Sequence, residues 1–420
     1  MFKSIFKSAT FRQSQITIVG TLVNGTLGAL FYVVLARILG PSDFGLLIIA
    51  ITTMVLIADI ADIGTNTGLV RFVSKNLAEN SDKAYKFLKL SLEIKLIAWV
   101  ISFLLLYLLA PFFAIEIFHK KELILPLRLA AFGVGSALLF SFATSALQAY
   151  QKYLSWSLIN ILTNSLRILL ILILSYFALN VENSLIVYIL LPFFGFFITL
   201  FILPTRKILQ SKEEFSLARE LFRYNIPVAI FTATAAFSAK LDAYLTAVLL
   251  SSKEVGIYGA ANQLISFMPQ LVSALGFVAS PKFSSFSSNK QMLTYFKKFQ
   301  LLVSGIIILG ISMIPFLPFI IPWVLGFAYQ ETVTPFIILF LAQLIFLFSI
   351  PVHHSVIFYF GRPDIFIWVS VGHLAIIGIL GYFMISNFGI IGAAFTVLVG
   401  TLFNLIAPLL WLLKKIHEKS

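Results

Sequence analysis

The chain has 420 residues, of which 60% belong to the apolar set and 11% are charged, and its formal net charge is +13. Soluble domains usually contain about 45–50% apolar and about 25% charged residues, so this chain lacks the charged surface that water requires. A bilayer accepts an apolar exterior around a modest polar interior. The composition therefore predicts an integral membrane protein.

The positive charge does not indicate nucleic-acid binding. The basic residues fall in short clusters between apolar runs, without the stacking aromatic residues that a nucleic-acid groove interleaves with them. No cysteine is present, which excludes disulfides and cysteine metal sites. The apolar stretch after the basic N-terminus is long enough to span a bilayer, so we expect an uncleaved first helix.

A spanning helix needs about 20 mostly apolar residues. Apolar runs between charged or Pro/Gly-rich breaks predict an all-α polytopic transmembrane bundle of about twelve helices. In chain order they lie near 14–38, 44–69, 90–113, 124–148, 154–179, 184–203, 224–249, 255–279, 298–321, 333–358, 365–386 and 389–413.

The basic residues alternate between connecting segments, as the positive-inside rule requires. With the N-terminus inside, the outside loops hold Lys120, Lys121 and Lys253. The inside segments hold most of the others, among them Lys3, Lys7, Lys75, Lys83, Lys86, Lys89, Lys95, Lys212, Lys282, Lys290, Lys298 and Lys419. We therefore expect a multi-pass protein of the cell (inner or plasma) membrane with both termini in the cytoplasm.

The chain also repeats. A shift of 211 residues places the segment 39–45 (LGPSDFG) on 250–256 (LSSKEVG), and each joins the first two helices of a half. The same shift brings the connection at Gln151 onto the one at Arg362. The repeat predicts two six-helix lobes, 1–208 and 209–420, in the same orientation around a central cavity.

Several segments resemble the polysaccharide-biosynthesis (Wzx-type) oligosaccharide flippases. In the first half they are 37–47 (RILGPSDFGLL) and 68–73 (GLVRFV). In the second half they are 221–227 (LFRYNIP), 240–242 (KLD) and 254–261 (EVGIYGAA). These flippases share a superfamily with multidrug extrusion (MATE) transporters and lipid II flippases.

The resemblance implies a two-lobed, MATE-like helical fold. It also implies that an undecaprenyl-diphosphate-linked oligosaccharide moves from the cytoplasmic to the outer leaflet by alternating access. A MATE-like ion-coupled small-molecule exporter is the first alternative. A membrane polysaccharide polymerase or ligase is the second, but its chemistry calls for a larger outside loop than this chain has. We expect no enzyme activity and no cofactor, a lipid-linked substrate in contact with membrane lipid, H⁺ or Na⁺ as coupling ion, and a monomer.

Ionisable and amide side chains inside a span usually face a wet cavity or a partner, because they are costly in lipid. Asn160, Asn164 and Arg167 recur at three- and four-residue spacing on one face of the helix 154–179. A guanidinium there could bind a diphosphate, and the amides could bind phosphate or sugar hydroxyls. Asn24 lies on a similar polar face of the first helix. The alternative for this stripe is interhelical packing or an ion pair with an aspartate of the second helix.

Three carboxylates within predicted spans are candidates for ion coupling: Asp59 and Asp62 in the second helix and Asp242 in the seventh. Lys240 is a further substrate-binding candidate, and its two-residue separation from Asp242 places the two on different sides of their helix. The alternative for Asp62 is a helix end in contact with headgroup water. His353 and His354 are adjacent and point to different faces, so we expect no metal site.

Overall fold

The computed structural model describes residues 9–177, 179–212 and 214–417. Lys3, Lys7 and Lys419, which the sequence places inside, lie outside the described residues. The described part is nearly all helical and has no strand. Its α-helices are α2 (Ala9–Ala61), α3 (Thr65–Glu79), α4 (Ser81–Phe112), α5 (Ile124–Ala149), α6 (Tyr153–Ser175), α7 (Val181–Ile202), α8 (Thr205–Gln210), α9 (Phe215–Leu249), α10 (Ser252–Ile265), α11 (Met268–Ser285), α12 (Asn289–Met313), α13 (Leu317–Leu325), α14 (Val333–His354), α15 (Ile365–Ala375) and α16 (Gly381–His417).

Short π-helical turns continue α4, α14 and α15 at Phe113–Ile117, Ser355–Tyr359 and Ile376–Leu380. Short 3₁₀ turns lie at Lys121–Leu123, Ile314–Phe316 and Phe327–Thr332. Several helices begin at a side chain that accepts a hydrogen bond from the first turn. Asn180 accepts from the Asn183 N–H at 2.8 Å before α7, and Ser251 forms a capping box with Glu254 before α10. These local signals start each helix where the apolar run begins.

Nine helices in the described residues are long and apolar enough to cross a membrane, some of them joined across a kink or a short turn. Their exteriors expose apolar side chains such as Leu108 (71% exposed) and Leu301 (75% exposed), as lipid contact requires. The nine are Gln15–Ala61, Ser81–Ile117, Lys121–Ala149, Tyr153–Ser175, Val181–Ile202, Ser216–Leu249, Asn289–Leu325, Phe327–Tyr359 and Ile365–His417.

Two of these long helices contain a glycine with non-helical backbone where the sequence predicts a connection between two helices. Gly40 has φ 73° within α2 and is followed by Pro41, and Gly389 has φ 56° within α16. Left-handed backbone favours glycine, so these residues kink the chain without strain. The eighth predicted helix, 255–279, is interrupted after Ile265, where α10 ends and α11 begins at Met268. The count of twelve spans stays a prediction.

The second predicted helix, 44–69, is wrong as a single helix. The chain leaves the helix at Ala61 and resumes at Thr65, with Ile63 at φ 49° and Gly64 at φ 68°. Positive φ is strained for a β-branched residue such as Ile63. A Cβ at Gly64 would lie 2.7 Å from the carbonyl oxygen of Asn225 in α9, so close packing demands the glycine. The stretch from Asp62 to Gly68 is rich in polar residues and glycine, which is typical of a helix break, but the predicted helix 44–69 ran through it.

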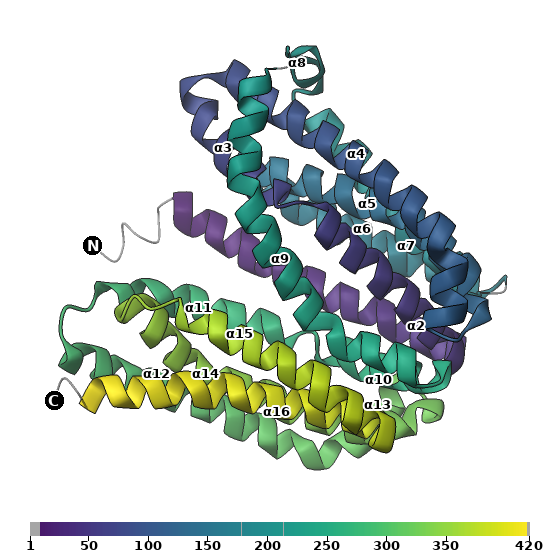
Figure 1. Cartoon of the computed structure of the whole chain (residues 1–420), viewed down its shortest axis with the longest axis vertical. Helices are drawn as coiled ribbons and strands as arrows, with labels where there is room; N and C mark the ends of the chain where they lie inside the picture. The colour runs from purple at the N-terminus through teal and green to yellow at the C-terminus, as the bar shows by residue number, and fades with distance from the viewer. Residues whose placement is uncertain (1–8, 178, 213, 418–420) are drawn as a thin grey trace. The chain divides into compact units, whose positions relative to one another are not determined.

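The chain divides into two compact units, 1–39 with 46–240 and 40–45 with 241–420. The division falls within α9, after Lys240. In the first unit α5 packs against α4 and α7, as Figure 1 shows. Buried apolar residues, among them Phe87, Phe142 and Phe196, form its core. The lobe boundary that the repeat predicts, 208/209, stays a prediction.

In the second unit α14 and α16 lie side by side (Figure 1), and Phe283, Phe299 and Leu347 lie in its apolar core. This unit also contains the segment 40–45 of α2, which begins at the kink and packs against the start of α10. A Cβ on Gly45 would lie 1.9 Å from the Ser252 carbonyl oxygen, and one on Gly256 would lie 1.8 Å from that of Pro41. The two glycines that the 211-residue shift aligns therefore lie at one backbone contact.

Candidate substrate-binding site

A cavity of about 320 Å³ lies inside the first unit, between α2, α5, α6 and α7. Hydroxyl, amide and guanidinium groups line it next to a few apolar side chains. Its polar lining consists of Asn24, Ser136, Ser141, Thr144, Asn160, Thr163, Asn164, Arg167 and Tyr188. Four residues predicted to bind substrate, Asn24, Asn160, Asn164 and Arg167, thus line one cavity. Lys240 lies on α9 and is not among its lining residues.

Arg167 is held in one orientation at the wall of this cavity. Its Nη1 donates to Asn164 Oδ1 at 3.0 Å, and its Nη2 donates to the Tyr188 carbonyl oxygen at 3.1 Å. The guanidinium carbon lies 4.2 Å from the centroid of the Tyr188 ring, close enough for a cation–π contact. The buried Nε has no hydrogen-bond partner in the described residues. A guanidinium has five N–H donors, so Arg167 is fixed in place with donors left for a ligand.

The amides extend this arrangement from α6 to α2. Asn164 Nδ2 donates to Asn24 Oδ1, so Arg167, Asn164 and Asn24 form one hydrogen-bonded chain. Asn160 Nδ2 donates instead to the Trp156 carbonyl oxygen of its own helix, at 2.8 Å. Among the described residues Arg167 has no ion pair with an aspartate of the second helix, and its hydrogen-bond partners are an amide and a carbonyl.

A buried ion pair lies directly behind the cavity wall. Lys95 is fully buried on α4, and its Nζ donates to Asp62 Oδ1 and, at 2.9 Å, to Ser141 Oγ. Asp62 also accepts from Thr65 Oγ1 at 2.8 Å and from the Asn66 N–H at 3.3 Å. Asp62 thus accepts hydrogen bonds from the first turn of α3 as well as from Lys95. Ser141 also lines the cavity, so its hydroxyl lies between the Lys95 ammonium and the cavity.

Lys95 is fully buried in the helical bundle, although the sequence predicts it in an inside segment between spans. Helix α4 begins at Ser81, so Lys95 lies about 20 Å along it at 1.5 Å per residue, inside the helical bundle. A signal was present in the sequence: Lys95 continues the buried stripe of Ala84, Leu88 and Ser91, which recur at helical spacing. Counting lysines for topology hid this position.

The remaining charged candidates are not among the residues that line the cavity. Asp59, one turn before Asp62, is exposed, and its charge interacts with those of Asp62 and Lys240. Asp242 belongs to the second unit, where its Oδ2 accepts a hydrogen bond from Tyr258 Oη at 2.6 Å. Lys240 and Asp242 are therefore two residues apart in sequence but belong to different units.

The histidines bond to backbone carbonyls. His353 Nε2 lies 2.9 Å from the Asn404 carbonyl oxygen, and His354 Nδ1 lies 2.9 Å from that of Ile350. Within the described residues, no three side chains of His, Asp or Glu gather as a metal site would need.

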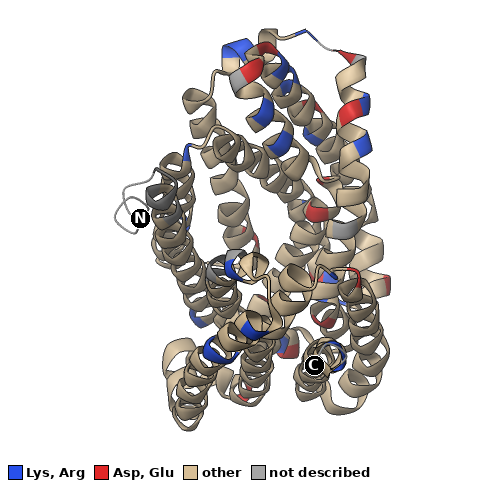
Figure 2. Ribbon diagram, turned by 90° about the vertical axis from the view of Figure 1, so that its left-hand side faces the viewer, with Lys and Arg blue, Asp and Glu red and all other residues tan. Residues whose placement is uncertain are grey.

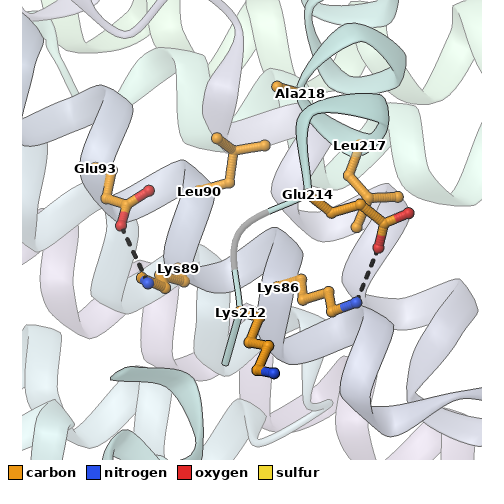
Figure 3. A pocket seen from close by; sticks show the side chains of 8 residues that line it. All are labelled: Lys86, Lys89, Leu90, Glu93, Lys212, Glu214, Leu217 and Ala218. Atoms are coloured by element: carbon orange, nitrogen blue, oxygen red, sulfur yellow. Dashed lines mark hydrogen bonds and ion pairs between the residues drawn. The ribbon is translucent and has the colours of Figure 1, made fainter. Parts of the chain in front are cut away.

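Charged residues of both signs gather at one end of the first unit, at the top of Figure 2, where α8 lies in Figure 1. Figure 3 shows the pocket of about 410 Å³ there, with Lys89 joined to Glu93 and Lys86 joined to Glu214. The Lys86 Nζ lies 2.8 Å from Glu214 Oε2, and this hydrogen bond lowers the pKa of the exposed Glu214 carboxyl below its ordinary value. Lys212 lines the same pocket. The Lys86–Glu214 pair ties the segment before α9 to α4, whereas the Lys89–Glu93 pair lies within α4.

Replacing Lys86 with methionine tests this tie. A lowered folded-state pKa means that the pair stabilises the fold above the unfolded pKa of Glu214, about 4.3, and loses its effect as the pH falls through the folded pKa. We expect Lys86→Met to unfold at a slightly lower temperature than the wild type at pH 7, and at the same temperature in acid below both pKa values. Thermal unfolding at several pH values measures this, and a difference that persists in acid would show that packing rather than charge is lost.

Three comparisons with known proteins bear on this architecture. The model of a family described as "Polysaccharide biosynthesis protein" matches residues 11–287, which include every cavity residue named above. A structure of the lipid II flippase MurJ in an inward closed conformation aligns with a TM-score of 0.76 at 14% identity. The alignment covers 94% of this chain and 87% of the MurJ chain. An inward-facing multidrug resistance MATE family transporter aligns with a TM-score of 0.74 at 12% identity. That alignment covers 94% of this chain and 95% of the transporter chain. No curated protein matches the sequence. At these identities the solved structures show a shared fold.

Proposed function

Because the chain belongs to the polysaccharide biosynthesis protein family, we propose that it is a flippase for an undecaprenyl-diphosphate-linked oligosaccharide. It would carry this lipid from the cytoplasmic to the outer leaflet of the cell membrane by alternating access, with both termini in the cytoplasm. The observation that carries the proposal is the polar cavity with Arg167 fixed at its wall. A fixed guanidinium that lines the cavity suits a diphosphate, and amides beside it suit sugar hydroxyls.

The alternative is a MATE-like ion-coupled exporter of small molecules, and the likeness to a multidrug transporter favours it. Exporters of cations need an acidic cavity. Here the named polar lining contains one cation, Arg167, and no carboxylate. This charge supports an anionic substrate over a cationic drug.

The direct test uses purified protein in proteoliposomes and a fluorescent undecaprenyl-diphosphate oligosaccharide. We expect the probe to reach the opposite leaflet only in liposomes that contain the protein, as measured by quenching with a membrane-impermeant reagent. A fluorescent cationic drug serves as the competing substrate. Movement of the drug without movement of the lipid-linked sugar would replace the flippase with the exporter.

We assign ion coupling to Asp59 among the three predicted carboxylates. Asp62 bonds to Lys95 and Asp242 to Tyr258, whereas the Asp59 side chain is exposed and could exchange a proton or bind Na⁺. We expect Asp59→Asn to flatten the dependence of probe movement on an imposed pH or Na⁺ gradient. Asp82→Asn, which removes an exposed carboxylate from the first turn of α4, is the matched control. An unchanged gradient dependence in Asp59→Asn would remove this assignment.

A further inference from the structure

A second basic groove, of about 780 Å³, lies in the second unit where α11 ends and α12 begins. Three lysines line it, Lys282 from α11 and Lys290 and Lys298 from α12, together with hydroxyl and amide side chains. No carboxylate is among the lining residues. The pocket of the first unit in Figure 3 also has three lysines, but there Glu93 and Glu214 compensate them. The two sites differ in charge balance rather than in lysine number.

The geometry keeps the three ammonium groups around the same space. Lys290 and Lys298 are eight residues apart, which places them on one face of α12. Lys282 reaches this face from the other side, with its Nζ 5.6 Å from the centroid of the Tyr295 ring. All three side chains are exposed, and none has an ion pair with a described residue. Their like charges repel one another unless an anion lies between them.

The surroundings of the groove resemble those of a membrane surface. Helix α12 begins at Asn289, which is also the first residue of the candidate span Asn289–Leu325. The polar first turns of α12 lead into the apolar run 298–321 that the sequence predicts to span, so the groove lies at the polar end of that run, where we expect lipid phosphates. The half-buried rings of Phe286 and Tyr295 add apolar surface to its lining. The first turn of α12 contains no acidic side chain, so its N–H groups add to the positive potential.

We propose that this groove binds the phosphate of an anionic phospholipid headgroup. The lysines and the start of α12 bind the phosphate, and the aromatic rings contact the glycerol and upper acyl chain of the same lipid. A free phosphate ion would use only the first of these contacts. The attraction of a basic residue for anionic lipid corresponds to about fivefold in affinity, so three lysines give about a hundredfold preference over a zwitterionic lipid.

The test compares thermal unfolding of the full-length protein in non-ionic detergent with added phosphatidylglycerol, phosphatidylcholine or inorganic phosphate. A ligand that binds only the folded state raises the unfolding temperature. We expect phosphatidylglycerol to raise it for the wild type, at low salt more than at high salt, and phosphatidylcholine and inorganic phosphate to leave it unchanged. The groove variant Lys282→Gln/Lys290→Gln/Lys298→Gln should lose this rise.

The matched control is Lys86→Gln/Lys89→Gln/Lys212→Gln, which removes the same charge from the compensated pocket of the first unit. It should keep the rise with phosphatidylglycerol, measured from its own baseline. An equal rise in the groove variant, a loss in both variants, or no rise in the wild type would overturn the proposal. An equal rise with inorganic phosphate would make the groove a site for a free anion instead. None of these outcomes depends on what the protein transports, so they leave the flippase proposal to its own test.

Discussion

Replacing Arg167 with alanine should lower the rate of probe movement about 10- to 100-fold while the protein remains folded. Hydrogen bonds to charged groups contribute about 1.5–3 kcal/mol, and about 1.4 kcal/mol corresponds to a factor of ten. The substitution removes the guanidinium that would hold the diphosphate, and with it the hydrogen bond that orients Asn164 toward Asn24. The leaflet assay in proteoliposomes measures the rate.

Two further variants make this result specific. Arg167→Lys keeps the charge but loses the planar fork and the contact with Tyr188, so we expect an intermediate rate. Arg128→Ala is the matched control. Arg128 also lies over a tyrosine ring in the first unit, 5.0 Å from the centroid of Tyr107, but it is not among the cavity residues. Wild-type rates in both Arg167→Ala and Arg167→Lys would remove Arg167 from the substrate site.

The second large effect is expected from Lys95→Met, which should destabilise the first unit by about 3–5 kcal/mol. Removing one partner of a buried ion pair leaves the other charge without compensation, and the cost is of this size. Asp62 would keep its bonds to Thr65 and Asn66 but lose its counter-charge, and its side chain is only 13% exposed. Thermal unfolding in detergent should show an early transition.

The double variant Lys95→Met/Asp62→Leu separates charge from packing. Replacing both charges with apolar groups is often close to neutral, so the double variant should regain most of the lost stability. Lys86→Met, which breaks an exposed pair on the same helix, should produce no comparable loss. A double variant as unstable as the single one would show that the ammonium is needed for its bond to Ser141.

Local sequence signals predicted the helices well but missed two features of the site. The apolar runs and turn residues led to spans that the structure largely reproduces, including the breaks at Gly40 and Gly389. The spacing of Asn160, Asn164 and Arg167 identified the face of α6 that lines the cavity. The break at Ile63 and Gly64 lies in a polar stretch, 62–68, that the predicted helix ran through, and the close approach of α9 requires a glycine at position 64. The burial of Lys95 was not predicted, because a lysine near a predicted helix start usually lies in water.

The sequence by itself determined the membrane environment of this protein, its all-helical class and the polar face of α6. Hydropathy and helical period depend only on residues that are neighbours in the chain. Only the tertiary structure decided which polar residues meet. Asn24 and Asn164 are far apart in the chain, as are Asp62 and Lys95, and packing of α2 against α6 and of α3 and α5 against α4 brings their side chains into contact. The charge balance of the two lysine pockets was likewise decided by folding, since a carboxylate compensates a lysine only where the backbone brings them within a few ångströms.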